Sequence, residues 1–427
     1  MDSNPFLSYF GLDGDDYYPA DPEPTDTDNG KGWHLKERRM NVPCPFCGSF
    51  DSVVVHSHYT RIIDMTDNAH KTTTATVERI LYECKSCQKT FAADLRGLRK
   101  NASFTRETEM KVRRDFHGPA PFSEIGRRFN KSETWAIKAF DAMFPKVARS
   151  PMPRAICLDE LQFLHKGPSR YPCIITDAIT KKPVDLVRSR QKEALEAYFR
   201  SIPLSEMPSV EFVVSDMYDK HWPVQRMFAP DATMVVDPFH VAWQLTHAIS
   251  VIRARAMKAI APTEDGKRTP EYKFMMRCWK EFGTRPWKLP KKPFSWEGGR
   301  ESHPGMIRRC LALSRDLSEA YDAVQSLYKA ADGCRTVDDG LKAIEFMSRK
   351  LRSCSSETLT SVGDTFWKWR VPIANGFARK SFGWNLTNGP AENMNSRIRK
   401  LLSSSYGYQN FERLRKRVLL VYRDKLD

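Results

Sequence analysis

Three carboxylates in this chain have the residue type and the sequence context for chemistry on a metal ion. Asp159 and Asp216 close short apolar runs with a preference for β structure, at residues 156–161 and 212–216, and Glu392 opens a basic segment predicted to be helical. A fold that brings them together would form a hard-oxygen site for divalent cations. In a chain of net charge +16, such a site indicates metal-assisted chemistry on a polyanion.

Composition limits the class of protein. The chain has 427 residues, of which 41% are hydrophobic, so that two to four domains with separate cores are expected. No apolar run approaches the roughly 18 residues of a membrane span, and the first residues do not resemble a secretory signal. We therefore expect a protein without a membrane partner that stays in the cytoplasm.

Four of the ten cysteines form two Cys-x-x-Cys pairs. Cys44, Cys47, Cys84 and Cys87 are separated by a segment that suits two hairpin strands, which predicts a zinc ribbon over residues 39–95 with a structural Zn²⁺. The alternative is four unpaired thiols. His56 and His58 are predicted to be strand residues, because the four-cysteine set is complete without them. The other cysteines are predicted to be small buried hydrophobes: Cys157, Cys173, Cys278, Cys310, Cys334 and Cys354.

Charge is unevenly distributed along the chain. The first 29 residues hold eight acidic and no basic side chains, so the remainder carries about +24. Residues 1–38 are predicted to be a disordered, solvated acidic leader, with weak competition against nucleic acid as the less favoured role. Basic residues gather from Arg96 to Arg114 and from Arg397 to Lys425, and both stretches are predicted to face phosphates.

Residues 100–150 change to a helical period. Apolar residues at i, i+3 and i+7 lie on either side of a break at residues 130–132, which predicts two short helices after a basic helix. This arrangement resembles a helix-turn-helix DNA-binding domain whose second helix, starting near Ser132, presents Lys131, Thr134 and Lys138 to a major groove. A plain helical hairpin gives the same pattern.

Residues 151–427 are predicted to form the catalytic domain. Strands are expected at 155–163, 172–176, 183–187, 210–216 and 233–237, with helices at 192–202 and 223–228, which is the order of an RNase H-like α/β core. In that order the first strand lies beside the fourth, so Asp159 and Asp216 can face each other. From about 245 to 380 the pattern predicts an all-α insertion with an irregular segment rich in Pro, Gly and Lys. Trp367 and Trp369 are predicted to pack in its core rather than stack on bases.

The third carboxylate falls at a predicted helix start. Asn388 or Gly389 can cap this helix and Pro390 suits its first turn, where the helix dipole favours an ionised Glu392. Asn395, Ser396 and Arg399 share the face of Glu392, and the basic residues Arg397, Arg399 and Lys400 are predicted to bind DNA. Asp237 and His240 either border the site or, as is favoured, have a structural role in which Asp237 caps the helix that contains His240.

These segments, taken in order, resemble bacterial insertion-sequence transposases of the ISL-three family. The resemblance rests on the cysteine pairs, the helix-turn-helix pattern, Asp159-Glu160, residues 214–218, residues 236–241, the Asn388-x-x-x-Glu392-Asn393-x-Asn395 segment and a Tyr-Gly-Tyr segment at 405–411. Leu161, where an aromatic residue is frequent, and Pro238 depart from the family pattern without removing a carboxylate.

The resemblance implies a DDE transposase that cuts double-stranded DNA at transposon ends and joins it to target DNA. Asp159, Asp216 and Glu392 would be the catalytic triad and would hold two Mg²⁺ or Mn²⁺ ions. Pairing of two ends implies at least a homodimer on DNA, and the DNA substrate implies association with the bacterial nucleoid. One alternative is a non-catalytic zinc-ribbon and helix-turn-helix regulator derived from a transposase. Another is an RNase H-like nuclease that cuts without joining.

Overall fold

The computed structural model of the chain describes residues 5–27, 30–66, 72–99, 102–161, 171–219, 221–404 and 410–424. The chain divides into two compact units, the first formed by Met1–Ala148 with Arg399–Asp427 and the second by Arg149–Ile398. Within the described residues, no helix is long and apolar enough to cross a membrane. The Tyr-Gly-Tyr residues at 405–409 lie outside the described part of the chain.

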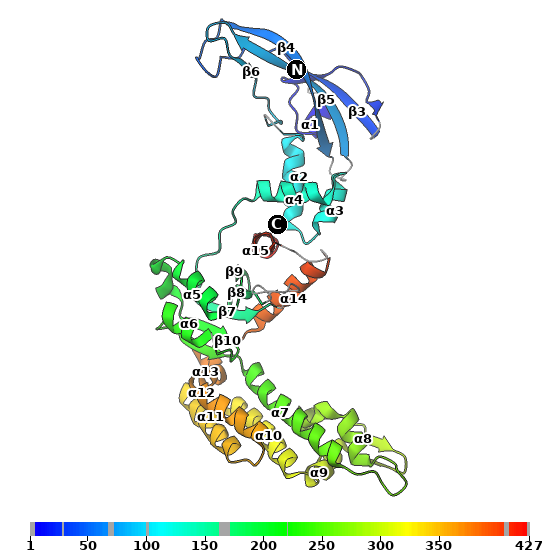
Figure 1. Cartoon of the computed structure of the whole chain (residues 1–427), viewed down its shortest axis with the longest axis vertical. Coiled ribbons are helices and arrows are strands. Elements are labelled where there is room, and N and C mark those ends of the chain that lie inside the picture. The colour runs from blue at the N-terminus through cyan, green and yellow to red at the C-terminus, as the bar shows by residue number, and fades with distance from the viewer. Residues whose placement is uncertain are drawn as a thin grey trace. The chain divides into compact units, whose positions relative to one another are not determined.

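The first unit begins with a short helix and a six-stranded sheet (Figure 1). Long strands β4 and β5 form an antiparallel hairpin between the two cysteine pairs, as predicted, and β3 lies parallel to β5. The sheet order is β1-β3-β5-β4, with β2 on β3 and β6 on β5. The elements are α1 (Pro5–Tyr9), β1 (Tyr17–Pro19), β2 (Thr25–Thr27), β3 (Gly30–Glu37), β4 (Val53–Thr66), β5 (Thr72–Cys84) and β6 (Thr90–Ala92).

The prediction of a disordered acidic leader is wrong for residues 5–27 and 30–38. Leu7 and Tyr17 are buried in the core of the sheet unit. The carboxylate of Asp16 accepts hydrogen bonds from the backbone and side chain of Arg96, and Glu37 is buried against Arg79. The acidic side chains are therefore held by arginines that are distant in sequence, and the apolar residues between them pack into the sheet unit.

Three helices follow at the predicted positions: α2 (Arg106–His117), α3 (Phe122–Arg128) and α4 (Glu133–Met143). Ser132 caps α4 by accepting from the Trp135 amide. The α3–α4 turn is tight, because Asn130 has a left-handed φ of 53° and a Cβ at Gly126 would lie 2.8 Å from the Lys131 carbonyl oxygen. The helical pattern predicted for this region is confirmed.

The domain boundary at the C-terminus differs from the prediction. Residues 399–427 were expected in the catalytic domain, but they belong to the first unit. Helix α15 (Phe411–Tyr422) packs against α2, and the buried Arg417 donates to the carbonyl oxygens of Phe116 and Ala120. The helical domain predicted at 100–150 therefore includes a segment from the far end of the chain.

The second unit contains a five-stranded mixed sheet in the order β11-β10-β7-β8-β9. β7, β8 and β9 form an antiparallel meander, whereas β10 and β11 run parallel to β7. The predicted pairing of the first strand with the fourth is thus confirmed. The elements are β7 (Ala155–Glu160), β8 (Cys173–Asp177), β9 (Pro183–Val187), α5 (Lys192–Arg200), η1 (Leu204–Ser209), β10 (Phe212–Ser215), α6 (His221–Phe228) and β11 (Thr233–Val236).

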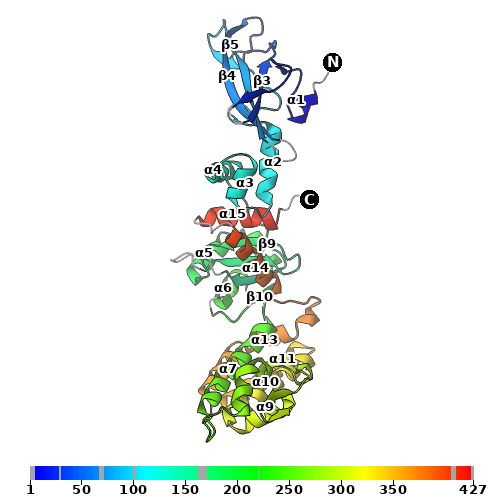
Figure 2. The ribbon, with the colours of Figure 1, turned by 90° about the vertical axis from the view of Figure 1, so that its right-hand side faces the viewer.

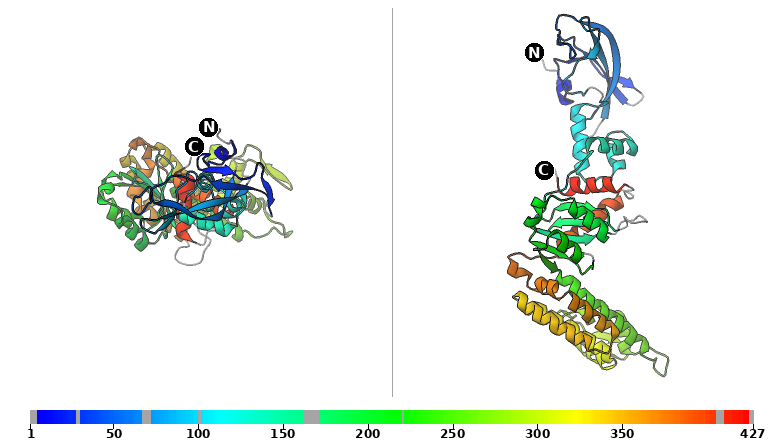
Figure 3. Two further views of the ribbon diagram at one scale, coloured as in Figure 1. Left: turned by 90° about the horizontal axis from the view of Figure 1, so that it is seen from above. Right: turned by 60° about the vertical axis from the view of Figure 1, so that its left-hand side comes forward.

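A helical region follows β11 and shares one continuous core with the sheet. Figures 2 and 3 show its long helices side by side, and α7 packs against α10 and α12. Trp369 lies in this core, as predicted. The elements are α7 (Pro238–Ala259), α8 (Pro270–Arg277), η2 (Trp279–Gly283), η3 (Pro286–Lys288), β12 (Phe294–Trp296), β13 (Gly299–Glu301), α9 (His303–Ala312), α10 (Arg315–Gly333), α11 (Val337–Arg352), α12 (Glu357–Lys368), α13 (Arg370–Phe377) and η4 (Arg379–Phe382). Helix α14 (Gly389–Ser404) follows them, and its residues from Arg399 onward belong to the first unit.

The prediction that this insertion is all-α is wrong at one place. β12 and β13 form an antiparallel hairpin inside the segment expected to be irregular. Gly298 in its turn has a φ of 89°, which a glycine adopts without strain. The hairpin is too short for a periodic signal, since each of its strands has three residues.

Candidate active site

The register of the second sheet brings the first two carboxylates to neighbouring positions. Val214 pairs with Cys157 and Ser215 with Leu158, in parallel strands. Continuing this register by one residue places Asp216 beside Asp159. Side chains alternate along a strand, so both carboxylates share the face of Cys157, whose thiol lies 3.3 Å from the Thr387 carbonyl oxygen. This is the face toward the segment that leads into α14, opposite the face covered by α5 and α6 (Figure 1).

Asp159 is held by residues on two elements. The Asn395 side-chain amide of α14 donates to Asp159 Oδ2 at 2.8 Å, and the Glu160 backbone amide donates to Oδ1 at 2.9 Å. Burial and then the charge of Asp216 raise the pKa of Asp159 to about 6, although the Asn395 hydrogen bond opposes this rise. The charge of Glu392 also raises this pKa, so the charges of both other carboxylates act on Asp159.

Asp216 has a different environment. Burial raises its pKa, but the hydrogen bond and the charge of His221 more than offset this, and the net pKa is lowered. His221 Nδ1 lies 3.4 Å from Asp216 Oδ1, and the Tyr218 amide donates to the same oxygen at 3.1 Å. Two neighbouring carboxylates with pKa values shifted in opposite directions are typical of functional sites.

Glu392 lies in the first turn of α14, as predicted. His240 Nε2, on α7, lies 3.2 Å from Glu392 Oε1. Asp237 caps α7 by accepting from the Phe239 amide at 2.8 Å, and its second oxygen accepts from the Asn388 amide at 2.6 Å. Asp237 therefore has the structural role that was favoured and joins the starts of two helices, whereas His240 borders the carboxylate site.

The donor set fits a hard divalent cation. The three carboxylates supply oxygen ligands, which is the donor type that Mg²⁺ and Mn²⁺ prefer. The side chain of Asn388 and Asn395 Oδ1 are buried without a hydrogen-bond partner among the described residues. In the described part of the chain, however, the carboxylate oxygens of Asp159, Asp216 and Glu392 do not all lie within 4.8 Å of one another.

The four predicted zinc ligands of the first unit do form such a group. The sulfur atoms of Cys44 and Cys87 lie 3.6 Å apart, as do those of Cys47 and Cys84. These spacings approach the roughly 3.8 Å edge of a tetrahedral ZnS₄ centre with bonds of about 2.3 Å. Burial raises the pKa of Cys44, but the amide N–H groups of Phe46 and Cys47 bring it down to about 7. The cluster fits a zinc ribbon.

Both cysteine pairs lie in similar knuckles. The Gly48 amide donates to the Cys44 carbonyl at 2.9 Å, and the Gln88 amide donates to the Cys84 carbonyl at 2.7 Å. Each turn needs a left-handed residue at its end, with φ of 73° at Gly48 and 58° at Gln88. His56 and His58 are strand residues of β4, as predicted, and contact Glu83 and Glu78.

The predicted DNA-binding residues lie on three segments. Thr134 and Lys138 are exposed on α4, and Arg399 and Lys400 are exposed on α14, where Arg397 is half-buried. Lys131 forms an ion pair of 2.9 Å with Asp64 of β4. Lys131 thus has a structural partner, and its assignment as a DNA contact stays a prediction together with the other five.

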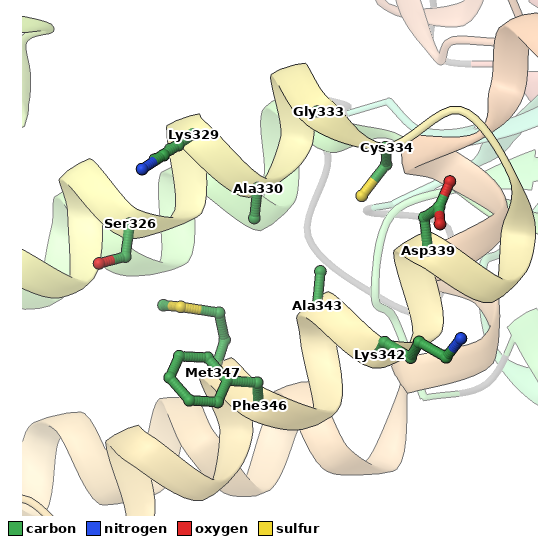
Figure 4. A pocket seen from close by; sticks show the side chains of 10 residues that line it. All are labelled: Ser326, Lys329, Ala330, Gly333, Cys334, Asp339, Lys342, Ala343, Phe346 and Met347. Carbon is green, nitrogen blue, oxygen red and sulfur yellow. The ribbon is translucent and has the colours of Figure 1, made fainter.

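An open pocket of about 540 Å³ lies between α10 and α11 in the helical region (Figure 4). Cys334 and Asp339 lie near the turn between these helices, and Met347 and Phe346 lie farther along α11. None of the three carboxylates lines this pocket.

Two contacts at the site were not predicted. His221 lies five residues after Asp216, and its proximity depends on the turn that leads into α6. Arg190 pairs with Glu160, and its guanidinium carbon lies 4.7 Å from the ring centroids of Tyr171 and Tyr218. A single arginine or histidine gives no periodic signal in a sequence. The only sequence signals for these contacts are the adjacency of Glu160 to Asp159 and the short interval from Asp216 to His221.

Comparison with known proteins identifies the family. A family model described as a transposase, of the ISL-three DDE type, matches residues 156–418. The comparison with curated proteins found no match. The matched region covers more than half of the chain and contains Asp159, Asp216 and Glu392, together with the sheet and helices that position them. The chain therefore belongs to the ISL-three family of DDE transposases.

Proposed function

We propose that this transposase binds transposon-end DNA and catalyses strand cleavage and strand transfer into target DNA, with Asp159, Asp216 and Glu392 as the catalytic carboxylates. The observation that carries this proposal is the shared register of β7 and β10, which sets two carboxylates side by side with Glu392 coupled to Asp159. The strand order and connections also support an RNase H-like core.

The three carboxylates would hold two Mg²⁺ or Mn²⁺ ions. When bound, such ions activate the attacking oxygen and stabilise the leaving oxygen of a phosphodiester. Asn395 orients Asp159, His221 keeps Asp216 ionised, and His240 contacts Glu392. Water would be the first nucleophile and the released 3′-hydroxyl the second. Each of these two steps forms one P–O bond and breaks another.

DNA recognition is proposed for the first unit. Exposed Thr134 and Lys138 follow the capped start of α4, where a recognition helix of a helix-turn-helix presents its side chains. A zinc ribbon on the four cysteines would support this unit. Arg397, Arg399 and Lys400 would contact DNA phosphates from α14. Pairing of two ends would require at least a homodimer on DNA.

The test uses the full-length protein and a duplex that carries the terminal repeats flanking its own gene. With Mg²⁺, we expect nicked ends and products joined to a target plasmid. Asp216→Asn and Glu392→Gln should abolish both products, because each removes a carboxylate charge without a large change of shape. Asp231→Asn, at an exposed position of the same unit, is the matched control.

The outcomes separate the alternatives. Full activity of Asp216→Asn would remove this residue from the site. Cleavage without joined products would favour an RNase H-like nuclease. A wild-type protein that binds transposon-end DNA but neither cuts nor joins it, with binding that survives Asp216→Asn and Glu392→Gln, would favour the non-catalytic regulator.

A further inference from the structure

A second group of metal-ligand side chains lies in the helical region of the second unit. Donor atoms of Cys278, Glu281 and His303 all lie within 4.8 Å of one another. The group contains neither the catalytic carboxylates nor the four cysteines of the first unit. We propose that Cys278, Glu281 and His303 bind a second Zn²⁺ ion, which links three segments of the helical region.

Each ligand comes from an ordered position. Cys278 directly follows α8, and its amide donates to the Phe274 carbonyl at 2.8 Å. Glu281 lies on the following η2 turn, and His303 lies at the start of α9, which is capped by Ser302. α8 packs against α9, so the two ends of the group belong to neighbouring helices (Figure 1). A bound ion would therefore join α8, η2 and α9.

The surroundings fix the imidazole. The His303 ring centroid lies 5.6 Å from that of Phe274 and 6.4 Å from that of Phe294, in edge-to-face arrangements. Its Nδ1 contacts the Glu281 carboxylate, and the side chains of His303 and Glu281 are only 9% and 13% exposed. Aromatic walls and shielding from water are typical of a preorganised metal site.

The three side chains can bind one ion together. A divalent cation binds cysteine as the thiolate and releases its proton, and it also accepts a carboxylate oxygen and an imidazole nitrogen as ligands. The donor atoms of Cys278, Glu281 and His303 are close enough to one another for this.

The ligand types select zinc. One thiolate, one imidazole and one carboxylate form a borderline-soft set, in contrast to the oxygen-only set of the three catalytic carboxylates. Three protein ligands leave one position of a tetrahedral ion for water. The alternative is an ion pair between His303 and Glu281 without a metal ion, with Cys278 as a thiol beside it.

Metal content of the purified full-length protein, measured by mass spectrometry after dialysis against excess Mg²⁺, tests the proposal. We expect about two zinc ions per chain, one at the four-cysteine cluster and one at this group. Cys278→Ser and His303→Ala should each lower the content to about one. Cys47→Ser should do the same through the other site, and Cys334→Ser, at another half-buried cysteine of the helical region, should leave about two.

A second measurement covers variants that fail to fold. In the wild-type protein, Zn²⁺ should slow alkylation of Cys278 at least tenfold, and chelation should restore it, as mapped by peptide mass spectrometry. A wild-type content of about one zinc ion that is lost in Cys47→Ser, or alkylation of Cys278 that is insensitive to Zn²⁺, would overturn the proposal in favour of the ion pair.

Discussion

The Asn395 side-chain amide donates to Asp159 Oδ2 at 2.8 Å and to the Glu160 carbonyl at 2.9 Å, across 236 residues of sequence. This contact joins α14 to the end of β7 and fixes the orientation of a carboxylate whose neighbours repel it. Burial of Asp159 and then repulsion by Asp216 therefore make the charged site destabilising in the metal-free protein, as expected where function competes with stability.

Asp159→Asn should stabilise the metal-free protein. The pKa of Asp159 is raised from 3.8 to about 6, so the folded protein holds a proton that the unfolded chain releases. Below pH 3.8 Asp159 is protonated in both the folded and the unfolded state, and its raised pKa does not change stability. The destabilisation of the folded state grows as the pH rises and is complete above pH 6. A shift of this size corresponds to about 3 kcal/mol at most. Urea unfolding between pH 4 and pH 8 measures the difference.

The control for this variant is Mg²⁺. Millimolar Mg²⁺ should raise the unfolding midpoint of the wild-type protein and have a smaller effect on Asp159→Asn, because a ligand that binds only the folded state stabilises it. Equal stability of the two proteins at pH 8 without metal would show that the charge of Asp159 does not destabilise the folded state.

His240→Ala should lower DNA cleavage by about 10- to 100-fold, the usual effect of removing a side chain that orients a metal ligand. His240 Nε2 lies 3.2 Å from Glu392 Oε1, so its removal leaves Glu392 free to turn away. Cleavage as a function of Mg²⁺ concentration should show partial recovery at high Mg²⁺, and His240→Gln, which retains a donor, should restore more activity than alanine.

His247→Ala is the matched control, since His247 is exposed on the same helix and stacks on Trp243 with ring centroids 5.1 Å apart. It should cleave like the wild-type protein. A loss of the same size in both variants would assign the effect to α7 rather than to the contact with Glu392.

The parts of this fold that follow from local patterns could be predicted from the sequence. The apolar strands that end at Asp159 and Asp216, the cysteine knuckles and the start of α14 each have a short-range signal. The order of strands and helices then predicted that β7 pairs with β10, which the structure confirms.

The errors concern contacts between distant segments. The acidic leader is ordered because Asp16 and Glu37 meet Arg96 and Arg79, which composition alone cannot show. The place of α15 in the first unit depends on Arg417, whose partner Phe116 is 301 residues away. In both cases the decisive interaction is an arginine contact without periodicity, and the arginine is buried at Arg79 and Arg417.

Glu37→Ala should destabilise the first unit by about 3–5 kcal/mol, because it leaves a buried arginine without its counter-ion. The side chains of Arg79 and Glu37 are 2% and 0% exposed. Lys36→Ala is the control, since Lys36 pairs with Glu78 at 3.4 Å on the surface and should change stability by less than about 1 kcal/mol. Glu37→Ala combined with Arg79→Met should recover part of the loss. Similar unfolding midpoints for both single variants would contradict an ordered leader.

Arg417→Met should destabilise the first unit by roughly 3 kcal/mol, because a buried and a part-buried carbonyl oxygen lose a charged donor while the methionine retains most of the apolar packing. The guanidinium of Arg417 donates to Phe116 and Ala120 and lies 5.5 Å from the Phe122 ring centroid. Fluorescence of Trp135, which packs on Phe129, can follow unfolding of this unit.

Arg413→Ala is the matched control on the same helix. Arg413 pairs with Asp141 at 2.6 Å, but the Asp141 side chain is 41% exposed, so the loss should stay below about 1 kcal/mol. A truncation before residue 411 should reproduce the effect of Arg417→Met, because it removes the whole of α15. If the truncated protein kept the wild-type midpoint, α15 would not be part of the first unit's stable core.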